Sequence, residues 1–243
     1  MKVHLIMPMA GAGSRFLNCG YNLPKPLIPI QDKPFFYWAV KSITKFIDVD
    51  LTFVVLKEHI VNNNIDQEIK KYFPESNIIV LDKILNGALL TCLQGIRNIN
   101  DDFPIIFNDC DHAFKCEEFY KYCNNKIKDY DGLILTFESD EDKYSYIKLN
   151  NDNLVIKTIE KEVISNHAIC GVYYFKNKTI FLKAADEYLQ KCNYKEYFVS
   201  GIYNVLIENK LKVGHFDVDY HLSFGTPSEY QEAKNSFLFK ELL

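Results

Sequence analysis

The chain has 243 residues, of which 48% are hydrophobic and 25% charged, and its formal net charge at pH 7 is −4. This length and apolar content suffice for one full hydrophobic core, and the lack of a basic excess argues against a nucleic-acid partner. The N-terminus has no charged and then apolar leader, and no apolar run reaches the roughly 20 residues of a membrane helix. We therefore expect a cytoplasmic protein with no membrane partner.

Strands and helices alternate along the first half of the chain. Apolar runs predict strands at 3–7, 51–56, 77–81 and 103–107, and helical periods predict helices at 35–46, 60–72 and 87–96. This order favours a parallel sheet with crossover helices, in which ligands bind at the carboxyl ends of the strands.

The pattern changes after residue 131 to shorter strands that alternate apolar and polar residues. We predict strands at 132–137, 144–149, 154–159 and 168–175, helices at 178–190 and 197–209, a strand at 212–216 and a helix at 226–237. Thr226 is a candidate cap of the last helix, with Glu229 placed for a capping box. The chain is predicted to be one α/β domain, 1–243, with a Rossmann-like three-layer sandwich and a mostly parallel central sheet.

A glycine loop follows the first strand. Gly11 and Gly13 can turn their backbone N–H groups toward one point, which suits phosphate oxygens, and Arg15 adds a fixed charge. Lys25 stands between Pro24 and Pro26, which we expect to hold its backbone extended and stiff. A stiff lysine beside a glycine nest predicts a triphosphate site.

Two other glycine loops do not match. A P-loop would end in Gly-Lys-Ser or Gly-Lys-Thr, and a dinucleotide fingerprint would place a third small residue where Phe16 stands. A dehydrogenase is therefore disfavoured.

Acids follow the strand at 103–107. Asp111 is the best candidate ligand for magnesium, a hard ion that prefers carboxylate oxygens and substrate phosphates. Asp109 would point to the opposite face if the strand continued. His112, next to Asp111, is expected to be a structural or polar contact.

These motifs resemble the sugar-phosphate nucleotidylyltransferase family and its phosphocholine cytidylyltransferase relatives, with further matches at Gly87-Ala88, Glu160-Lys161 and Gly225-Thr226-Pro227. The resemblance implies a GT-A-like nucleotidyltransferase fold with a nucleotide-binding half, 1–130, and an acceptor-binding half, 131–243. It implies Mg²⁺ as cofactor, and Lys25, Arg15 and Asp111 as the catalytic residues. The implied nucleotide contacts are Met9, Ala10, Gly11, Gly13, Ser14, Arg15, Lys25, Gly87 and Ala88, and the implied acceptor contacts are Glu160, Lys161 and Gly171.

The chain departs from the family at the second metal acid. The family usually has Asp two residues before the glycine of Gly-Thr-Pro, where this chain has Ser223. We expect Asp219, or failing that Asp217, to serve with Asp111 as metal ligand. The departure hints at an acceptor other than an ordinary hexose phosphate.

Capsule-associated members of the family show the strongest likeness and imply CTP as the donor and phosphoglutamine as the acceptor. A sugar 1-phosphate or phosphocholine is the alternative acceptor. A non-catalytic nucleotide sensor is a less favoured function, because both Lys25 and Asp111 are present. A homodimer is the default assembly for such an enzyme.

Overall fold

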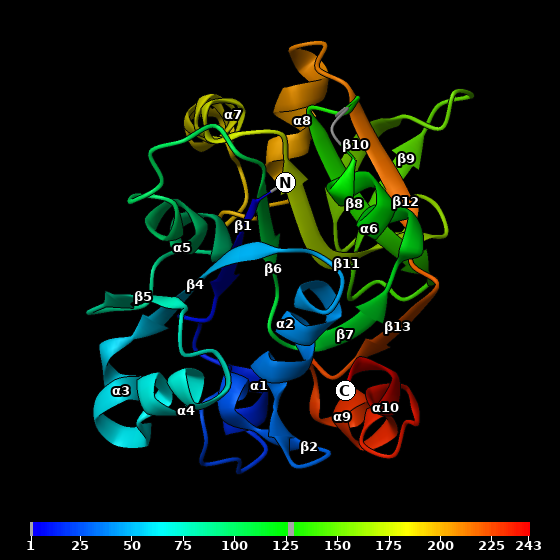
Figure 1. Ribbon diagram of the computed structural model, residues 1–243. Coiled ribbons are helices and arrows are strands. Elements are labelled where there is room, and N and C mark those ends of the chain that lie inside the picture. The colour runs from blue at the N-terminus through cyan, green and yellow to red at the C-terminus, as the bar shows by residue number, and fades with distance from the viewer. Residues whose placement is uncertain (1, 126–128) are drawn as a thin grey trace.

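A computed structural model describes residues 2–125 and 129–243 and is built around a nine-stranded sheet, β10-β9-β11-β6-β1-β4-β5, with β8 beside β11 and β12 beyond β8 (Figure 1). The strands are β1 (Val3–Pro8), β4 (Val49–Leu56), β5 (Asn77–Leu81), β6 (Ile105–Asn108), β8 (Gly132–Glu138), β9 (Ser145–Leu149), β10 (Val155–Glu160), β11 (His167–Phe175) and β12 (Val213–Asp217). The expected three-layer α/β fold is confirmed.

The strands of the first half pair in parallel. β1 lies between β4 and β6, with Leu5 opposite Leu51 on one side and Ile106 on the other. The residues of β1 from Val3 to Met7 are buried, which explains why all of them except His4 are apolar. β11 then joins β6 antiparallel, so β6 connects the two halves of the sheet.

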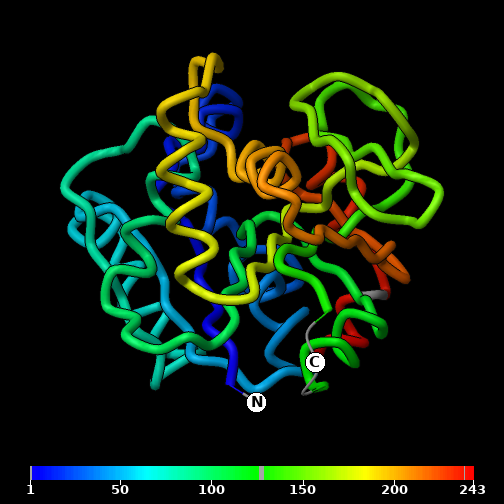
Figure 2. The backbone as a smooth tube through the Cα atoms, turned by 90° about the horizontal axis from the view of Figure 1, so that it is seen from above, coloured from blue at the N-terminus to red at the C-terminus, as the bar shows by residue number. Residues whose placement is uncertain are grey.

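Helices cover both faces of the sheet. One face packs against α5 (Ala88–Gly95), α7 (Lys178–Lys191) and α8 (Gly201–Glu208), and the other packs against α2 (Phe35–Thr44), α4 (Ile65–Tyr72) and α6 (Glu117–Asn124). Figure 2 shows α7 and α8 side by side when the molecule is seen from above. No helix among the described residues is long and apolar enough to cross a membrane.

A third apolar cluster lies at one end of the molecule. It joins Phe16 of α1 (Ser14–Leu17), Trp38 of α2, Ala233 of α9 (Pro227–Ala233) and Phe239 of α10 (Leu238–Leu242). Figure 1 shows α1, α9 and α10 gathered at that end, so the chain's last segment packs beside its first helix.

The elements differ from the sequence prediction at four places. The helix predicted at 60–72 is two helices, α3 (Lys57–Asn63) and α4, because Asn64 is left-handed with φ of 50°. The helix predicted at 197–209 begins only at Gly201, and the helix predicted at 226–237 ends at Ala233 before α10. Several short elements were not foreseen, among them α1, α6, the β2 (Pro29–Ile30) and β3 (Lys33–Pro34) pair, and a two-stranded ribbon.

That ribbon pairs β7 (His112–Lys115) with β13 (Tyr220–Ser223) in antiparallel register. Ser223 lies opposite His112, and the backbone N–H of Phe224 donates to the carbonyl of Asp111 at 2.9 Å. The ribbon thus brings the loop after β13 to the acids after β6.

Gly95 allows α5 to pack tightly on the sheet. A Cβ there would overlap Cγ2 of Ile6 and lie 3.1 Å from Cγ2 of Val54, and both neighbours are stiff β-branched side chains of buried strands.

We therefore expect Gly95→Ala to destabilise the fold by about 1 to 3 kcal/mol, because overpacking outweighs the better helix propensity of alanine. Urea unfolding followed by circular dichroism measures this. Gly11→Ala is the matched control: its Cβ would meet nothing within 4 Å, so its change should stay within about 0.5 kcal/mol. Equal stability of the two variants would contradict the packing argument.

Candidate active site

Two adjoining pockets open where β1 and β6 end. The first, here called the central pocket, has a volume of about 160 Å³ and is lined by residues including Arg15, Asp109, Asp111, Lys143, Tyr144 and Glu229. The second, here called the loop pocket, has about 200 Å³ and lies between the glycine loop and Lys25. Asp109 and Asp111 line both pockets, so these acids stand where the two meet.

An ion pair between Lys25 and Asp111 lies at this junction. The Nζ of Lys25 is 2.5 Å from Oδ2 of Asp111, and the two side chains are 26% and 21% exposed, so a ligand can still reach them. Burial opposes both charges, but the attraction between them prevails: it raises the pKa of Lys25 and lowers the pKa of Asp111. Both groups are therefore charged at neutral pH.

The predicted extended backbone at Lys25 is wrong. Residues 25–27 form a 3-10 turn, closed by hydrogen bonds from Leu27 N to the carbonyl of Pro24 and from Ile28 N to that of Lys25. The turn still fixes the lysine against the glycine loop, because a Cβ on Gly13 would lie 3.1 Å from Cβ of Lys25.

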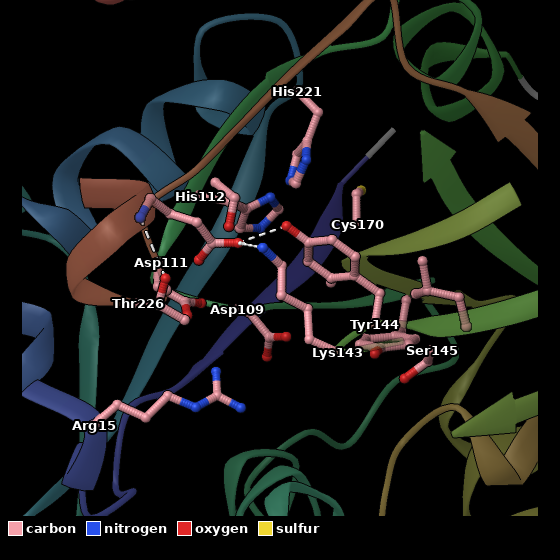
Figure 3. A pocket seen from close by; sticks show the side chains of 16 residues that line it. Arg15, Asp109, Asp111, His112, Lys143, Tyr144, Ser145, Cys170, His221 and Thr226 are labelled. Carbon is pink, nitrogen blue, oxygen red and sulfur yellow. Dashed lines mark hydrogen bonds and ion pairs between the residues drawn. The ribbon is translucent and has the colours of Figure 1, made fainter. Parts of the chain in front are cut away.

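The glycine loop lies at the carboxyl end of β1, as the strand pattern predicts. Gly13 has φ of +61° and begins α1, a conformation that favours glycine. Met9 and Ala10 are buried, whereas Gly11, which lines the loop pocket, and Ser14 are exposed. Arg15 is exposed and its guanidinium points into the central pocket (Figure 3).

Asp109 faces the same cleft as Asp111, contrary to the alternation expected of a continuing strand. β6 ends at Asn108, and the backbone N–H of Asp109 donates to the carbonyl of Gly171 at 3.0 Å as the chain turns. Gly171 has φ of +95°, and a Cβ there would lie 2.8 Å from Oδ2 of Asp109. Burial, followed by repulsion from Asp111, raises the pKa of Asp109 to about 7.

His112 is buried against the sheet. Its Nε2 lies 2.8 Å from Oδ1 of Asn108, whose amide donates to the carbonyl of Ala39. Burial lowers the pKa of His112 to about 4, so the ring is neutral at physiological pH. This agrees with a structural role.

Three residues that the sequence analysis did not assign to the site form its outer wall. The hydroxyl of Tyr144 donates to Oε1 of Glu229 at 2.5 Å, and Nζ of Lys143 lies 3.0 Å from the same oxygen (Figure 3). Glu229 was expected only as a capping residue, and its backbone N–H does donate to Oγ1 of Thr226 at 3.3 Å. Lys143 and Tyr144 belong to no sequence motif. They reach Glu229 because the tertiary fold places the start of β9 beside α9.

Gly225 sits directly against the ion pair. A Cβ at this position would overlap Oδ2 of Asp111 and lie 3.6 Å from Oε2 of Glu229. The small residue thus leaves room for the Asp111 carboxylate.

The expected acceptor residues Glu160 and Lys161 lie beyond Ser145. The carboxylate of Glu160 accepts hydrogen bonds from Ser145 Oγ, at 2.7 Å, and from Ser200 Oγ, while burial raises its pKa. Lys161 has φ of +54°, and its Nζ lies 5.7 Å from the ring centre of Phe198.

Gly87 has a packing role. Its φ is +101°, and a Cβ would lie 2.5 Å from both N and O of Tyr197. The carbonyl of Tyr197 accepts a hydrogen bond from Leu89 N, so the segment before α8 lies across the start of α5. Ala88, next to it, is exposed.

The structure does not bring Asp219 to Asp111. Asp219 is exposed at the far end of β13, where its Oδ2 accepts the backbone N–H of Glu117 at 2.8 Å and so stabilises the start of α6. The position nearest Asp111 on this ribbon is Ser223, because the antiparallel register runs the other way. Asp217 lies in a separate cluster with His167 and His215.

The raised pKa of Asp109 gives a testable pH dependence. Between about 3.9, the pKa of an unfolded Asp, and about 7, the folded chain keeps a proton that the unfolded chain has released. This group therefore lowers the free energy of unfolding as pH rises through that window.

We expect Asp109→Asn to gain stability relative to the unsubstituted protein between pH 5 and pH 8, measured by urea unfolding without divalent ions or nucleotide. Asp152→Asn, in an exposed turn, is the control and should show no such trend. A pH-independent difference for Asp109→Asn would refute the assignment.

Known proteins of similar sequence match this chain over nearly its whole length. The Bifunctional protein GlmU of Methanococcus maripaludis is 25% identical over 241 residues, which are 97% of this chain and 54% of the relative, so the chain spans about half of that protein. The D-glycero-alpha-D-manno-heptose 1-phosphate guanylyltransferase of Campylobacter jejuni is 26% identical over 235 residues, 93% of this chain and 96% of the relative.

Solved structures share the fold. A nucleoside-diphosphate-sugar pyrophosphorylase from Vibrio cholerae superposes with a TM-score of 0.81 at 23% identity, over 96% of this chain and all of that one. An inositol-1-phosphate CTP transferase from T. maritima gives a TM-score of 0.77 at 14% identity, over all of this chain and 94% of that one. Residues 4–239 match the family described as Nucleotidyl transferase, and the chain therefore belongs to the nucleotidyl transferase family.

Proposed function

We propose that this protein is a Mg²⁺-dependent nucleotidyltransferase, in which a phosphate oxygen of an acceptor attacks the α-phosphorus of a nucleoside triphosphate and pyrophosphate leaves. The observation that carries the proposal is the position of the Lys25–Asp111 ion pair beside the glycine loop, at the junction of the two pockets. Two polyanions must be brought together in this reaction, so positioning and charge neutralisation supply the catalysis.

The first half of the chain, 1–130, would bind the triphosphate. The loop around Gly11 and Gly13 offers backbone N–H groups. Lys25 would supply positive charge at the loop pocket, and Arg15 would supply it at the central pocket. Lys25 would change partners as the nucleotide binds, because its ammonium can donate to a phosphate oxygen as well as to Asp111.

The two acids at the end of β6 fit a magnesium ion. Asp109 and Asp111 offer only oxygen donors. Burial, followed by repulsion from Asp111, raises the pKa of Asp109, and a divalent cation would relieve that repulsion. We propose Asp109 in place of Asp219 as the second acid of this site. When bound, the ion would neutralise charge on the triphosphate.

The acceptor would enter from the second half, 131–243. Lys143, Tyr144 and Ser145 line the central pocket together with Gly171, and Lys161 lies on the same side beyond Ser145. No proton needs to be removed from an acceptor phosphate at neutral pH, which agrees with a neutral His112.

We propose CTP as the donor and phosphoglutamine as the acceptor, giving CDP-L-glutamine for capsular phosphoramidate synthesis. Support comes from the likeness to the CTP:phosphoglutamine cytidylyltransferase and from Ser223 at the position where sugar-phosphate enzymes usually carry Asp. A second candidate, a sugar 1-phosphate, is favoured by the heptose 1-phosphate guanylyltransferase among the relatives. Phosphocholine is a third acceptor to test.

Pyrophosphate release tests both parts of the proposal. The purified chain is supplied with Mg²⁺ and with each of four nucleoside triphosphates against phosphoglutamine, phosphocholine and a set of sugar 1-phosphates. We expect release with CTP and phosphoglutamine. Release with a sugar 1-phosphate alone would keep the reaction and overturn the acceptor, whereas magnesium-independent CTP binding without turnover would support a nucleotide sensor.

Lys25→Ala should lower kcat roughly 100-fold or more, because loss of one preorganised donor to the reacting phosphate has that cost. Fixed-time assays of pyrophosphate release with the active substrate pair measure this change in kcat. Lys71→Ala, which removes an exposed lysine paired with Glu68 on α4, is the matched control and should retain activity. Turnover by Lys25→Ala within a few-fold of the unsubstituted enzyme would exclude this mechanism, provided that both variants unfold at similar temperatures.

A further inference from the structure

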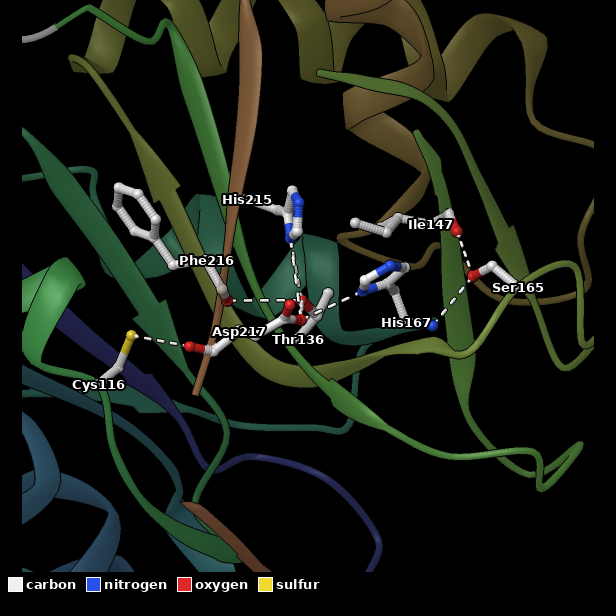
Figure 4. A network of polar contacts seen from close by, with 8 residues as sticks. All are labelled: Cys116, Thr136, Ile147, Ser165, His167, His215, Phe216 and Asp217. Carbon is white, nitrogen blue, oxygen red and sulfur yellow. Dashed lines mark hydrogen bonds and ion pairs between the residues drawn. The ribbon is translucent and has the colours of Figure 1, made fainter. Parts of the chain in front are cut away.

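Two histidines and an aspartate meet on the second half of the sheet, away from the cleft. His167 of β11 and His215 and Asp217 of β12 each offer one ligand atom, and these atoms lie within 4.8 Å of one another. Figure 4 shows the three side chains pointing toward one another beside Thr136. These three residues are here called the His-His-Asp cluster.

The sheet register builds this cluster. Thr136 of β8 is opposite Ile169 of β11 on one side and Asp217 of β12 on the other. Side chains two residues apart in a strand share a face, so His167 lies on the face of Ile169, and His215 on that of Asp217. β11 and β12, on either side of β8, thus direct their ligand atoms to one point beside Thr136.

The distances between the candidate ligand atoms are close to those expected around one metal ion. Nδ1 of His167 is 3.2 Å from Oδ1 of Asp217, and Nδ1 of His215 is 3.9 Å from the same oxygen. Metal bonds of 2.0 to 2.1 Å in a tetrahedral site would separate ligand atoms by about 3.4 Å. Small side-chain rotations are enough to reach that spacing.

Hydrogen bonds order the carboxylate and the backbone of the cluster. The buried hydroxyl of Thr136 donates to Oδ1 of Asp217 at 2.7 Å and lies 3.2 Å from Nδ1 of His215. The backbone N–H of His167 donates to Oγ of Ser165 at 3.0 Å, and that hydroxyl donates to the carbonyl of Ile147 at 2.6 Å. Thr136 thus contacts the carboxylate from behind, as the outer partners of metal ligands do.

A bound ion would be reached from solvent. A pocket of about 420 Å³ is lined by His167 and Asp217 together with Phe137, Glu138 and Asn166. The Asp217 side chain is 57% exposed and that of His167 is 26% exposed, whereas His215 is largely covered at 10%. The pocket leaves space for a water molecule as a fourth ligand.

We propose that the His-His-Asp cluster binds a first-row transition-metal ion of the Zn²⁺ class, at a site separate from the magnesium acids of the cleft. Two imidazoles with one carboxylate suit such ions, whereas Mg²⁺ prefers oxygen donors alone. The ion would join β11 to β12 across β8 and so fasten the edge strand β12 to the interior of the sheet.

The alternative is a hydrogen-bond network in which Asp217 simply accepts from Thr136 and His167. The two possibilities predict different effects of Zn²⁺ on the stability of the protein. A network gains nothing from the ion, whereas a site binds one equivalent and is stabilised by it.

The test uses the full chain, freed of metal with a chelator and kept in excess Mg²⁺ so that the cleft acids are supplied. Calorimetric titration should show that one equivalent of Zn²⁺ binds. Thermal unfolding should show a higher Tm with Zn²⁺ than without it. Co²⁺ in its place should give the visible absorption of a tetrahedral ion without a thiolate charge-transfer band.

His167→Gln and Asp217→Asn should each weaken Zn²⁺ binding by more than about 100-fold, because removal of a ligand exceeds the 10- to 100-fold effect of losing an outer partner. Thr136→Val keeps the shape of the buried side chain and should weaken binding by about 10- to 100-fold. His59→Gln, on α3, and Asp111→Asn, in the cleft, are the controls and should bind as the unsubstituted chain does.

Circular dichroism and metal-free Tm values establish that each variant is folded. Zn²⁺ binding that is unchanged in His167→Gln and Asp217→Asn would overturn the proposal, as would a Co²⁺ spectrum with thiolate bands from the cysteines. Failure of the unsubstituted chain to bind micromolar Zn²⁺ would equally overturn it. None of these readouts depends on catalytic activity, so they are separate from the test of the proposed reaction.

Discussion

The position of β6 is the constraint on which the rest of the site depends. It pairs in parallel with β1 on one edge and antiparallel with β11 on the other, so it belongs to both halves of the sheet. Its carboxyl end must therefore lie between the glycine loop, which follows β1, and Gly171, which lies in β11. Asp109 and Asp111, which follow Asn108, therefore line both pockets of the cleft.

Charge at this point is balanced by contacts from remote segments. Asp111 has Lys25 as its cation, and Glu229 has Lys143, while Asp109 is left with a raised pKa. The acids would repel one another strongly in a buried cleft without these lysines. In the proposed reaction a polyanionic nucleotide would change the balance, because it would compete with the carboxylates for Lys25 and increase the need for a cation between the acids and phosphate.

The parts of the fold that the sequence predicts are those governed by local periodicity. The strands β1, β4 and β5 are mostly apolar and were located to within two residues, and α7 was located equally well. Asp111 was expected in the cleft because it follows a strand, and it does line both pockets there. These features depend on burial of a single element, which the residue pattern records directly.

The parts that could not be predicted depend on pairing between distant segments. Asp109 was assigned to the wrong face because alternation holds only while a strand continues, and β6 ends one residue earlier. Asp219 was expected in the cleft by its distance along the chain, yet the β7–β13 register puts Ser223 there instead. Tyr197 was expected in a helix, but its backbone carbonyl is used by Leu89 of α5. No local pattern encodes these pairings.

The two groups of acids on this chain differ in a way that follows from their neighbours. The cleft acids stand among oxygen donors and a lysine, whereas Asp217 stands between two imidazoles. The segments are nevertheless connected, because only Val218 and Asp219 separate β12 from β13, and Asp219 joins the turn to α6. His221 of β13 lines both the central pocket and the pocket of the His-His-Asp cluster. A metal ion that fastened the end of β12 would thereby restrict β13, whose pairing with β7 sets the position of the segment against Asp111.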